Sequence, residues 1–130
     1  MFSPDNFRVN ETWIAFRANE EFLFVKDEPY DFYVLIDAAS TYVFGHAVSR
    51  VVDERPLRED VEALFKSAWA TKKAWAKRLI VTEDSPAEKA FIKEARKQGL
   101  IVENIPLSEL EPIVGELKES FRRDFMGIED

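Results

Sequence analysis

Residues 31–50 read DFYVLIDAASTYVFGHAVSR, two runs of β-branched and aromatic residues joined at Asp37-Ala-Ala-Ser40. Such runs on either side of a short polar connection predict a β-hairpin, with strands over 32–36 and 42–52. Gly45 interrupts the second strand, which predicts a bulge or a close backbone approach there. This hairpin decides the fold, because extended segments precede it and alternating helices and strands follow it.

The chain before the hairpin also favours extended structure. Residues 12–17, TWIAFR, alternate as a short strand does, and residues 21–25, EFLFV, form a second extended run. Asp27-Glu28-Pro29 is a turn sequence that leads into the hairpin. The first ten residues are interpreted as an irregular lead-in.

After the hairpin the hydrophobic period becomes helical. From Pro56, which suits a first helical turn, apolar residues recur at i, i+3, i+4, i+7 and i+8. They are Val61, Leu64, Phe65, Ala68 and Trp69. This spacing predicts a helix packed on the sheet, with Trp69 in the core. Residues 78–82, RLIVT, are typical of a short buried parallel strand.

Two more helices have recognisable ends. Ser85 as N-cap, Pro86 at N1 and Glu88 at N3 predict a helix start with a capping box, and Gly99 suits the position just past its end. Residues 100–102 predict one more buried strand. Ser108 with Glu111 repeats the capping box before a last apolar stripe, formed by Leu110, Ile113, Val114, Leu117 and Phe121.

The predicted order is three or four antiparallel strands, then helix, strand, helix, strand and helix. The later strands should be parallel, because a helix connects them and such crossovers are nearly always right-handed. Helices are then available to cover both faces of a mixed sheet. The chain has 130 residues, so we expect one α/β domain over 1–130.

Composition excludes several protein classes. The sequence contains no cysteine, which excludes disulfide scaffolds, thiolate metal sites and cysteine nucleophiles. Its start does not have the basic region and apolar run of a signal peptide, and no apolar stretch approaches the length of a membrane span. We therefore expect a soluble, cytoplasmic protein that makes no membrane contact.

The charge balance disfavours nucleic acid as a partner. The net charge is −7, and phosphate backbones repel such a surface unless basic residues are segregated on one face. Residues 72–78 contain four basic side chains, but these are interpreted as the solvated end of a helix, where cations are favoured. Asp124 directly follows Arg122-Arg123, and its negative charge weakens the positive potential of the two arginines.

The element order β-β-β-α-β-α-β-α resembles that of the ribonuclease H-like fold, and two passages are similar to its integrase and transposase branch. Residues 33–48, YVLIDAASTYVFGHAV, resemble the second and third strands of that family, with an Asp-x-x-Ser turn between them. Residues 79–85, LIVTEDS, with Phe91 and Gly99-Leu100, resemble its fourth strand, Asp-containing turn, helix and next strand. The resemblance covers residues 11–105.

The resemblance implies catalysis by three carboxylates that bind two Mg²⁺ ions. The first should lie mid-way along the first strand, where this chain has Phe16, or Phe22-Leu23-Phe24 if residues 21–25 are that strand. Asp84 matches the second acid, although a turn role before Ser85 is favoured. Asp37 matches a turn aspartate that does not bind metal. Glu116 and Glu119 lie near the third position, without a surrounding motif.

Other site chemistry is not indicated. His46 lies within a predicted strand, in register with Phe44 and Val48, and is interpreted as a packed or half-exposed structural histidine. No dinucleotide, P-loop, nucleophile-elbow or zinc-protease motif occurs. The aromatic residues fall at core-facing spacings, so a base-stacking platform is disfavoured. The sequence predicts no catalytic residue, no cofactor and no metal.

The functional hypothesis is a catalytically inactive ribonuclease H-like domain that acts by contact with another protein or as a small regulatory module. One alternative is a divergent metal-dependent phosphoryl-transfer enzyme that uses Asp84, Asp37 and Glu116 or Glu119. Another is a small-ligand domain with its site beyond the strand ends near Thr82–Ser85, where α/β folds place ligands. The partner, the biological process and the oligomeric state cannot be read from the sequence.

Overall fold

The computed structural model describes residues 1–19, 23–25, 27–50, 58–82 and 86–125. The strands are β1 (Thr12–Arg17), β2 (Leu23–Val25), β3 (Glu28–Asp37), β4 (Val43–Arg50), β5 (Arg78–Val81) and β6 (Ile101–Asn104). The α-helices are α1 (Arg58–Lys72), α2 (Pro86–Lys97) and α3 (Glu111–Phe125), and two 3-10 turns are η1 (Pro4–Asn6) and η3 (Leu107–Leu110). This order confirms the predicted succession of elements.

The six strands form one mixed sheet. β3 pairs with β1 and β2 along one edge and with β4 along the other, always antiparallel. β5 is parallel to β1, and β6 is parallel to β5. The hydrogen-bonded path is β2-β3-β1-β5-β6, and β4 pairs with β3 off this path. β3 runs opposite to the other strands.

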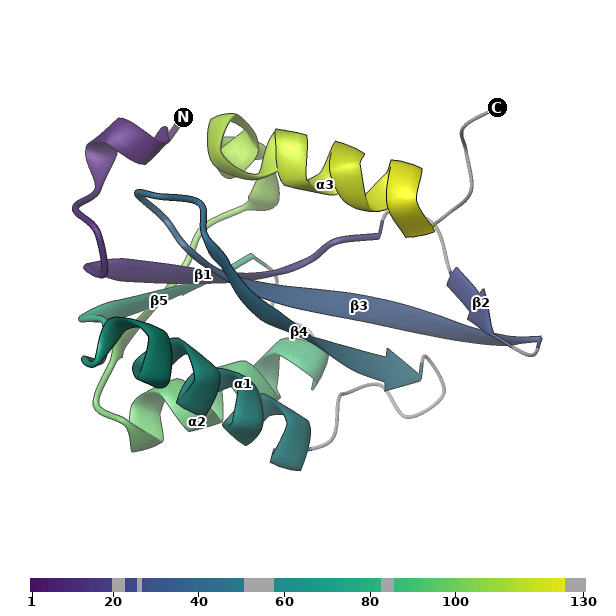
Figure 1. Cartoon of the computed structure of the whole chain (residues 1–130), viewed down its shortest axis with the longest axis horizontal. Helices are drawn as coiled ribbons and strands as arrows, with labels where there is room; N and C mark the ends of the chain where they lie inside the picture. Colours follow the sequence, from purple (N-terminus) through teal and green to yellow (C-terminus); the bar gives the residue numbers. More distant parts are fainter. Residues whose placement is uncertain (20–22, 26, 51–57, 83–85, 126–130) are drawn as a thin grey trace.

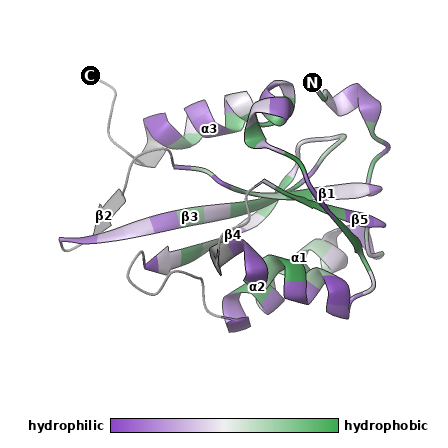
Figure 2. Ribbon diagram, turned by 180° about the vertical axis from the view of Figure 1, so that it is seen from behind, coloured by the Kyte–Doolittle hydropathy of each residue, from purple (hydrophilic) through white to green (hydrophobic). Residues whose placement is uncertain are grey.

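Helices cover both faces of the sheet, as predicted. α1 and α2 lie on one face, and α3 lies with the N-terminal segment on the other (Figure 1). Figure 2 shows that hydrophobic residues gather on the central strands between these layers. None of the described helices is both long and apolar enough to cross a bilayer.

Strand alternation gives each face its own core. Trp13 and Ala15 of β1 point towards α1 and α2, where they pack with Phe65 and Phe91. Ile14 and Phe16 point to the opposite side and pack against α3 and η3; the partners there include Leu110, Ile113 and Val114. Because both faces are covered, the first five residues of β1 are fully buried.

Two glycines have the roles that the sequence predicts. Gly99 has φ 86° just past α2, where Leu100 N–H donates to Ala95 O and Gly99 N–H to Arg96 O. These two bonds make a Schellman cap. Gly45 has φ 153° and adjoins a register shift in the β3–β4 ladder, and a Cβ added there would lie 2.9 Å from Leu64 Cδ1. Both the predicted bulge and the predicted close approach therefore occur.

The prediction that Trp69 lies in the core is wrong. Its side chain is 42% exposed, whereas Val61, Leu64, Phe65 and Ala68 of the same stripe are buried. At 3.6 residues per turn, Trp69 lies about 90° around the helix from the mean direction of those four residues. Its side chain is therefore at the margin of the buried face.

The last helix does not begin at Ser108. That residue lies inside the 3-10 turn η3, which has no side-chain cap, and α3 begins at Glu111. Pro112 explains the difference, because a residue without an N–H is tolerated only in the first helical turn. The other predicted cap residue, Ser85, lies outside the described residues.

Candidate functional site

Asp37 lies in the hairpin turn, where its carboxylate is fully buried. Oδ1 accepts a hydrogen bond from Asn10 N–H at 2.7 Å, and Oδ2 accepts from Ser40 N–H at 2.9 Å and Ser40 Oγ at 2.8 Å. Asp37 is also paired with Trp13, so it lies at the amino end of β1. A ligand site beyond the carboxyl ends of the parallel strands would be at the opposite end of the sheet.

The remaining acids considered as metal ligands do not converge in the described structure. Glu116 and Glu119 are exposed on α3, and Glu119 lies 3.7 Å from Arg122 in an ion pair. Asp84 lies outside the described residues. Among the described residues, no cluster of three or more aspartate, glutamate or histidine side chains is arranged to hold a metal ion.

Phe16 takes the place in which the resemblance expects the first acid. It is fully buried on the α3 side of β1. The last helix, which would carry the third acid, turns Leu117 and Ser120 towards it rather than Glu116 or Glu119. Hard divalent cations require oxygen ligands, so the described part of this position does not suit Mg²⁺.

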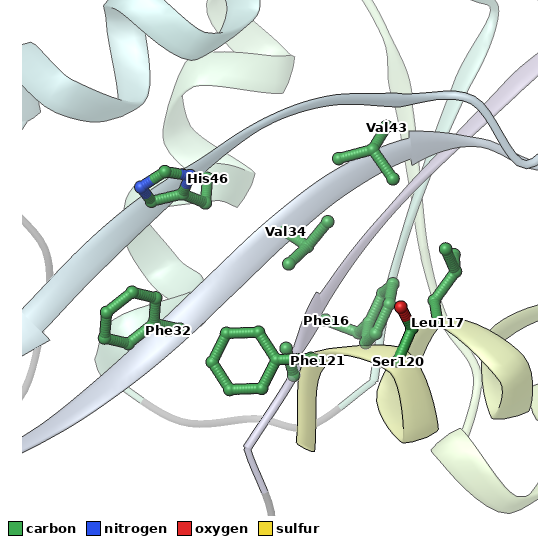
Figure 3. Close-up of a pocket in the computed structure, with 9 residues that line it drawn as sticks. Phe16, Phe32, Val34, Val43, His46, Leu117, Ser120 and Phe121 are labelled. Carbon is green, nitrogen blue, oxygen red and sulfur yellow. The ribbon is translucent and has the colours of Figure 1, made fainter. Parts of the chain in front are cut away.

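An apolar cavity of about 270 Å³ occupies the space between β1, β3, β4 and α3 (Figure 3). The rings of Phe16, Phe32 and Phe121 form much of its wall, and the Phe32 and Phe121 centroids are 5.4 Å apart. The other lining residues are Ala18, Val34, Val43, His46, Leu117 and Ser120. Because no acid, lysine or arginine is among these lining residues, the cavity is suited to uncharged, apolar groups.

His46 contributes to the rim of this cavity. Its side chain is exposed, and its ring stacks on Phe32 with centroids 5.8 Å apart and an interplanar angle of 22°. The bulge beside Gly45 separates it from Phe44, which packs against Trp13 on the other face of the sheet. The expected register of His46 with Phe44 is therefore wrong, because a bulge inserts one residue and reverses the alternation.

The carboxyl end of β5 is partly occupied by a buried pair. Glu88 Oε2 accepts hydrogen bonds from Thr82 Oγ1 at 2.9 Å and from Thr82 N–H at 3.3 Å. Thr82 is thus tied to α2 rather than free for a ligand. Ser85, at the far end of the predicted Thr82–Ser85 ligand site, lies outside the described residues.

Two basic residues of segment 72–78 have neighbours that engage them in the described structure. Lys72 ends α1, and Arg78 lies 3.5 Å from Glu103 in an ion pair across β5 and β6. Lys72 Nζ lies 5.8 Å from the centroid of the Tyr42 ring. The interpretation of residues 72–78 as a helix end holds only for Lys72, because α1 ends there and Arg78 begins β5.

The cavity was not predicted from the sequence. Its walls come from four elements, of which α3 is far along the chain from β1, β3 and β4. Each wall residue occurs at a spacing that is typical of core packing. Phe16 is the one wall residue that is unusual in the sequence, because the resemblance expects an acid there. Its presence indicates a lost metal site but does not indicate a cavity. Only the packing of α3 over the sheet shows the space.

Comparison with known proteins supports the fold. No protein-family model matches the sequence, and no curated protein matches it significantly. The structure is similar to the simian T-cell lymphotropic virus intasome in complex with PP2A regulatory subunit B56 gamma. The TM-score is 0.56 at 17% identity, over 98% of this chain and 44% of that chain. The fold is ribonuclease H-like.

A second similar structure is the HTLV-2 integrase catalytic core domain in complex with magnesium, in its trimeric form. It aligns with a TM-score of 0.50 at 15% identity, over 92% of this chain and 76% of that chain. The present chain spans less than half of the intasome chain. At these identities the similarity establishes an integrase-core-like fold and nothing about activity.

Proposed function

We propose that this protein is a catalytically inactive ribonuclease H-like module that acts by contact with another protein. The observation that carries the proposal is Phe16, which is fully buried at the place where the resemblance expects the first metal-binding acid. Two-metal phosphoryl transfer depends on carboxylates that hold both ions and neutralise the leaving oxygen. Phenylalanine, leucine and serine side chains do not supply that chemistry.

The overall charge also supports a role other than nucleic-acid processing. At a net charge of −7 the chain repels phosphate backbones. The Lys72 and Arg78 side chains are engaged with Tyr42 and Glu103 respectively, so they do not form an open basic track. A nuclease or transposase would need such a track to hold its substrate.

An exposed aromatic corner supports protein contact. We use this name for Tyr42, Trp69 and Lys72, which lie where the β3–β4 turn meets the end of α1. Tyr42 is 52% exposed and Trp69 is 42% exposed. Lys72 lies over Tyr42 and is one helical turn from Trp69. Tyrosine and tryptophan are the residues that most often dominate binding energy at protein interfaces.

Metal binding tests the proposed inactivity. We expect millimolar Mg²⁺ or Mn²⁺ to leave the melting temperature nearly unchanged. An ion that binds only the folded state, at one hundred times its Kd, would raise the free energy of unfolding by about 2.7 kcal/mol. Asp84→Asn should have little effect or stabilise slightly, because it relieves repulsion beside Glu83. The divergent-enzyme alternative requires a metal-dependent shift that Asp84→Asn abolishes, together with Mn²⁺-dependent nicking of plasmid DNA or RNA. Observation of both would refute the proposal.

Paired substitutions test the protein contact. The tagged chain is used to capture partners from cells of its source, and each captured protein is then titrated in purified form. We expect Tyr42→Ala and Trp69→Ala to weaken that binding at least tenfold, because each removes an exposed aromatic anchor. Ile101→Ala is the matched control, since Ile101 is 63% exposed on the distant β6 edge. Equal loss in the control, or no loss in either aromatic variant, would exclude the corner as the contact surface.

A further inference from the structure

We propose that the cavity beside α3 binds a small, uncharged aromatic molecule that carries one hydrogen-bonding group. The proposal concerns a site different from the aromatic corner, and a ligand in the cavity does not require that the corner bind a protein. Three features support it: the size of the cavity, the chemistry of its walls, and the polar atoms at its margin.

The size suits one or two fused rings. The cavity measures about 270 Å³. Apolar cavities of about 150 Å³ admit a benzene ring, so this one has room for a molecule of naphthalene size. Known small-molecule sites start at about this volume.

The walls favour an aromatic ligand over a purely aliphatic one. Phe32 belongs to a ring cluster: its centroid lies 5.4 Å from that of Phe121, at an interplanar angle of 54°, and 5.8 Å from that of His46. Tilted and stacked neighbours at these distances offer both ring faces and ring edges, which are the contacts that aromatic groups prefer. Phe16 adds a third phenylalanine ring from β1 (Figure 3).

Ser120 supplies a hydroxyl group for which the described structure shows no partner. Within the described residues its hydroxyl makes no hydrogen bond, although the side chain lines the cavity. Figure 3 shows the hydroxyl oxygen on the side of α3 that faces Phe16. A ligand hydroxyl or amine would satisfy it. The described lining residues include no acid, lysine or arginine, which disfavours an ionic ligand.

The cavity has a solvent-facing rim in the described structure. Val43 lines it and is 43% exposed, and His46 beside it is also exposed. A side chain enlarged at Val43 would therefore narrow the opening with little disturbance of the core. Such a variant separates loss of binding from loss of folding.

The test uses 2-naphthol as the probe and 2-naphthoate, which has the same rings with a negative charge, as its matched comparison. We expect 2-naphthol to bind saturably with one site per chain, as followed by its fluorescence and by a rise in melting temperature. 2-Naphthoate should bind at least tenfold more weakly, since burial of an unpaired carboxylate is unfavourable. Ser120→Ala should weaken 2-naphthol binding roughly 2- to 10-fold, the value of one hydrogen bond.

Blocking variants locate the probe. Leu117→Trp fills the cavity and Val43→Trp narrows its rim, and either should abolish binding while circular dichroism shows an intact fold. Ile101→Trp adds the same side chain on the exposed β6 edge and should leave binding unchanged. If Leu117→Trp fails to fold, Val43→Trp and Ser120→Ala still decide the question.

Several outcomes would overturn the proposal. They are the absence of saturable binding, equal affinity for the two probes, or full affinity in the folded Val43→Trp variant. A doubled mass in solution, reverted by Val43→Trp and accompanied by no 2-naphthol binding, would assign the cavity to a second copy of the chain. None of these results depends on metal binding or on nicking, so the proposed inactivity is tested separately.

Discussion

Thr12 opens β1 with a hydroxyl that is buried and has no hydrogen-bond partner in the described structure. Valine has nearly the same shape without this oxygen, so we expect Thr12→Val to stabilise the fold by about 1 kcal/mol. Urea unfolding measures the change. Thr12→Ser, which keeps the hydroxyl and loses a methyl group, is the control and should destabilise. A loss of stability in Thr12→Val would show that the hydroxyl has a partner in solution.

Trp13 and Trp69 contrast a buried and an exposed residue of the same type. Trp13 is fully buried, its ring contacts Phe44, Phe65 and Trp75, and its Nε1–H donates to Asn10 Oδ1 at 2.8 Å. We expect Trp13→Ala to cost about 3–5 kcal/mol, because it leaves a large cavity. Trp69→Ala should cost only about 1 kcal/mol, as most partly exposed substitutions do. Thermal unfolding measures the loss of stability in both variants. Equal losses would show that Trp69 contributes to the core as much as Trp13 does.

At the scale of elements, two glycines are expected to respond to alanine in opposite directions. In β4, Gly45→Ala would combine an unfavourable φ with a 2.9 Å approach to Leu64 Cδ1, so we expect a loss of about 1–3 kcal/mol. In α3, Gly115 is helical, and an added Cβ meets only the flexible, exposed carboxylate of Glu111. Gly115→Ala should therefore stabilise by about 0.5–1 kcal/mol.

Both glycine variants can be measured by denaturant unfolding. Glu111→Ala combined with Gly115→Ala is the useful control, because it removes the one close contact. A larger gain in this double variant would show that Glu111 resists displacement. A stabilising effect of Gly45→Ala would contradict the bulge geometry at the start of β4.

Across the whole molecule, one ion pair joins α1 to α2. Lys97 Nζ lies 3.0 Å from Glu62 Oε2, and this hydrogen bond and the lysine charge lower the pKa of Glu62 below its ordinary 4.5. A lowered folded-state pKa adds stability above pH 4.5, and that stability is lost as the pH falls through the folded value. Because the pair is partly exposed, salt should screen it.

We therefore expect wild type to be slightly more stable than Glu62→Gln at pH 7. The difference should shrink below pH 4.5 and in 0.5 M NaCl. Thermal unfolding at several pH values measures it, with Glu116→Gln as a control at an exposed glutamate of α3. A difference that persists at pH 3 would mean that Glu62 acts through packing rather than through charge.

The order of elements and the class of fold can be predicted from local features of the amino-acid sequence. Strand alternation over residues 12–17, the hairpin around Asp37, the apolar stripe from Val61 and the Gly99 cap are local signals, and each depends on residues within a few positions. The missing first acid is also visible in the sequence, because the resemblance expects an acid at the position that Phe16 occupies in the strand. These predictions needed no knowledge of how the elements pack.

Tertiary structure alone decided what surrounds those residues. Trp69 is exposed at the margin of the face that α1 buries on the sheet. Ser108 lies inside a 3-10 turn and does not cap α3, which begins at Glu111. The cavity exists because α3 lies over β1, β3 and β4 without filling the space between them. Contacts among residues up to 105 positions apart, from Phe16 to Phe121, set that volume. Periodicity within one element carries no information about such distances, so the candidate site could be found only in the folded chain.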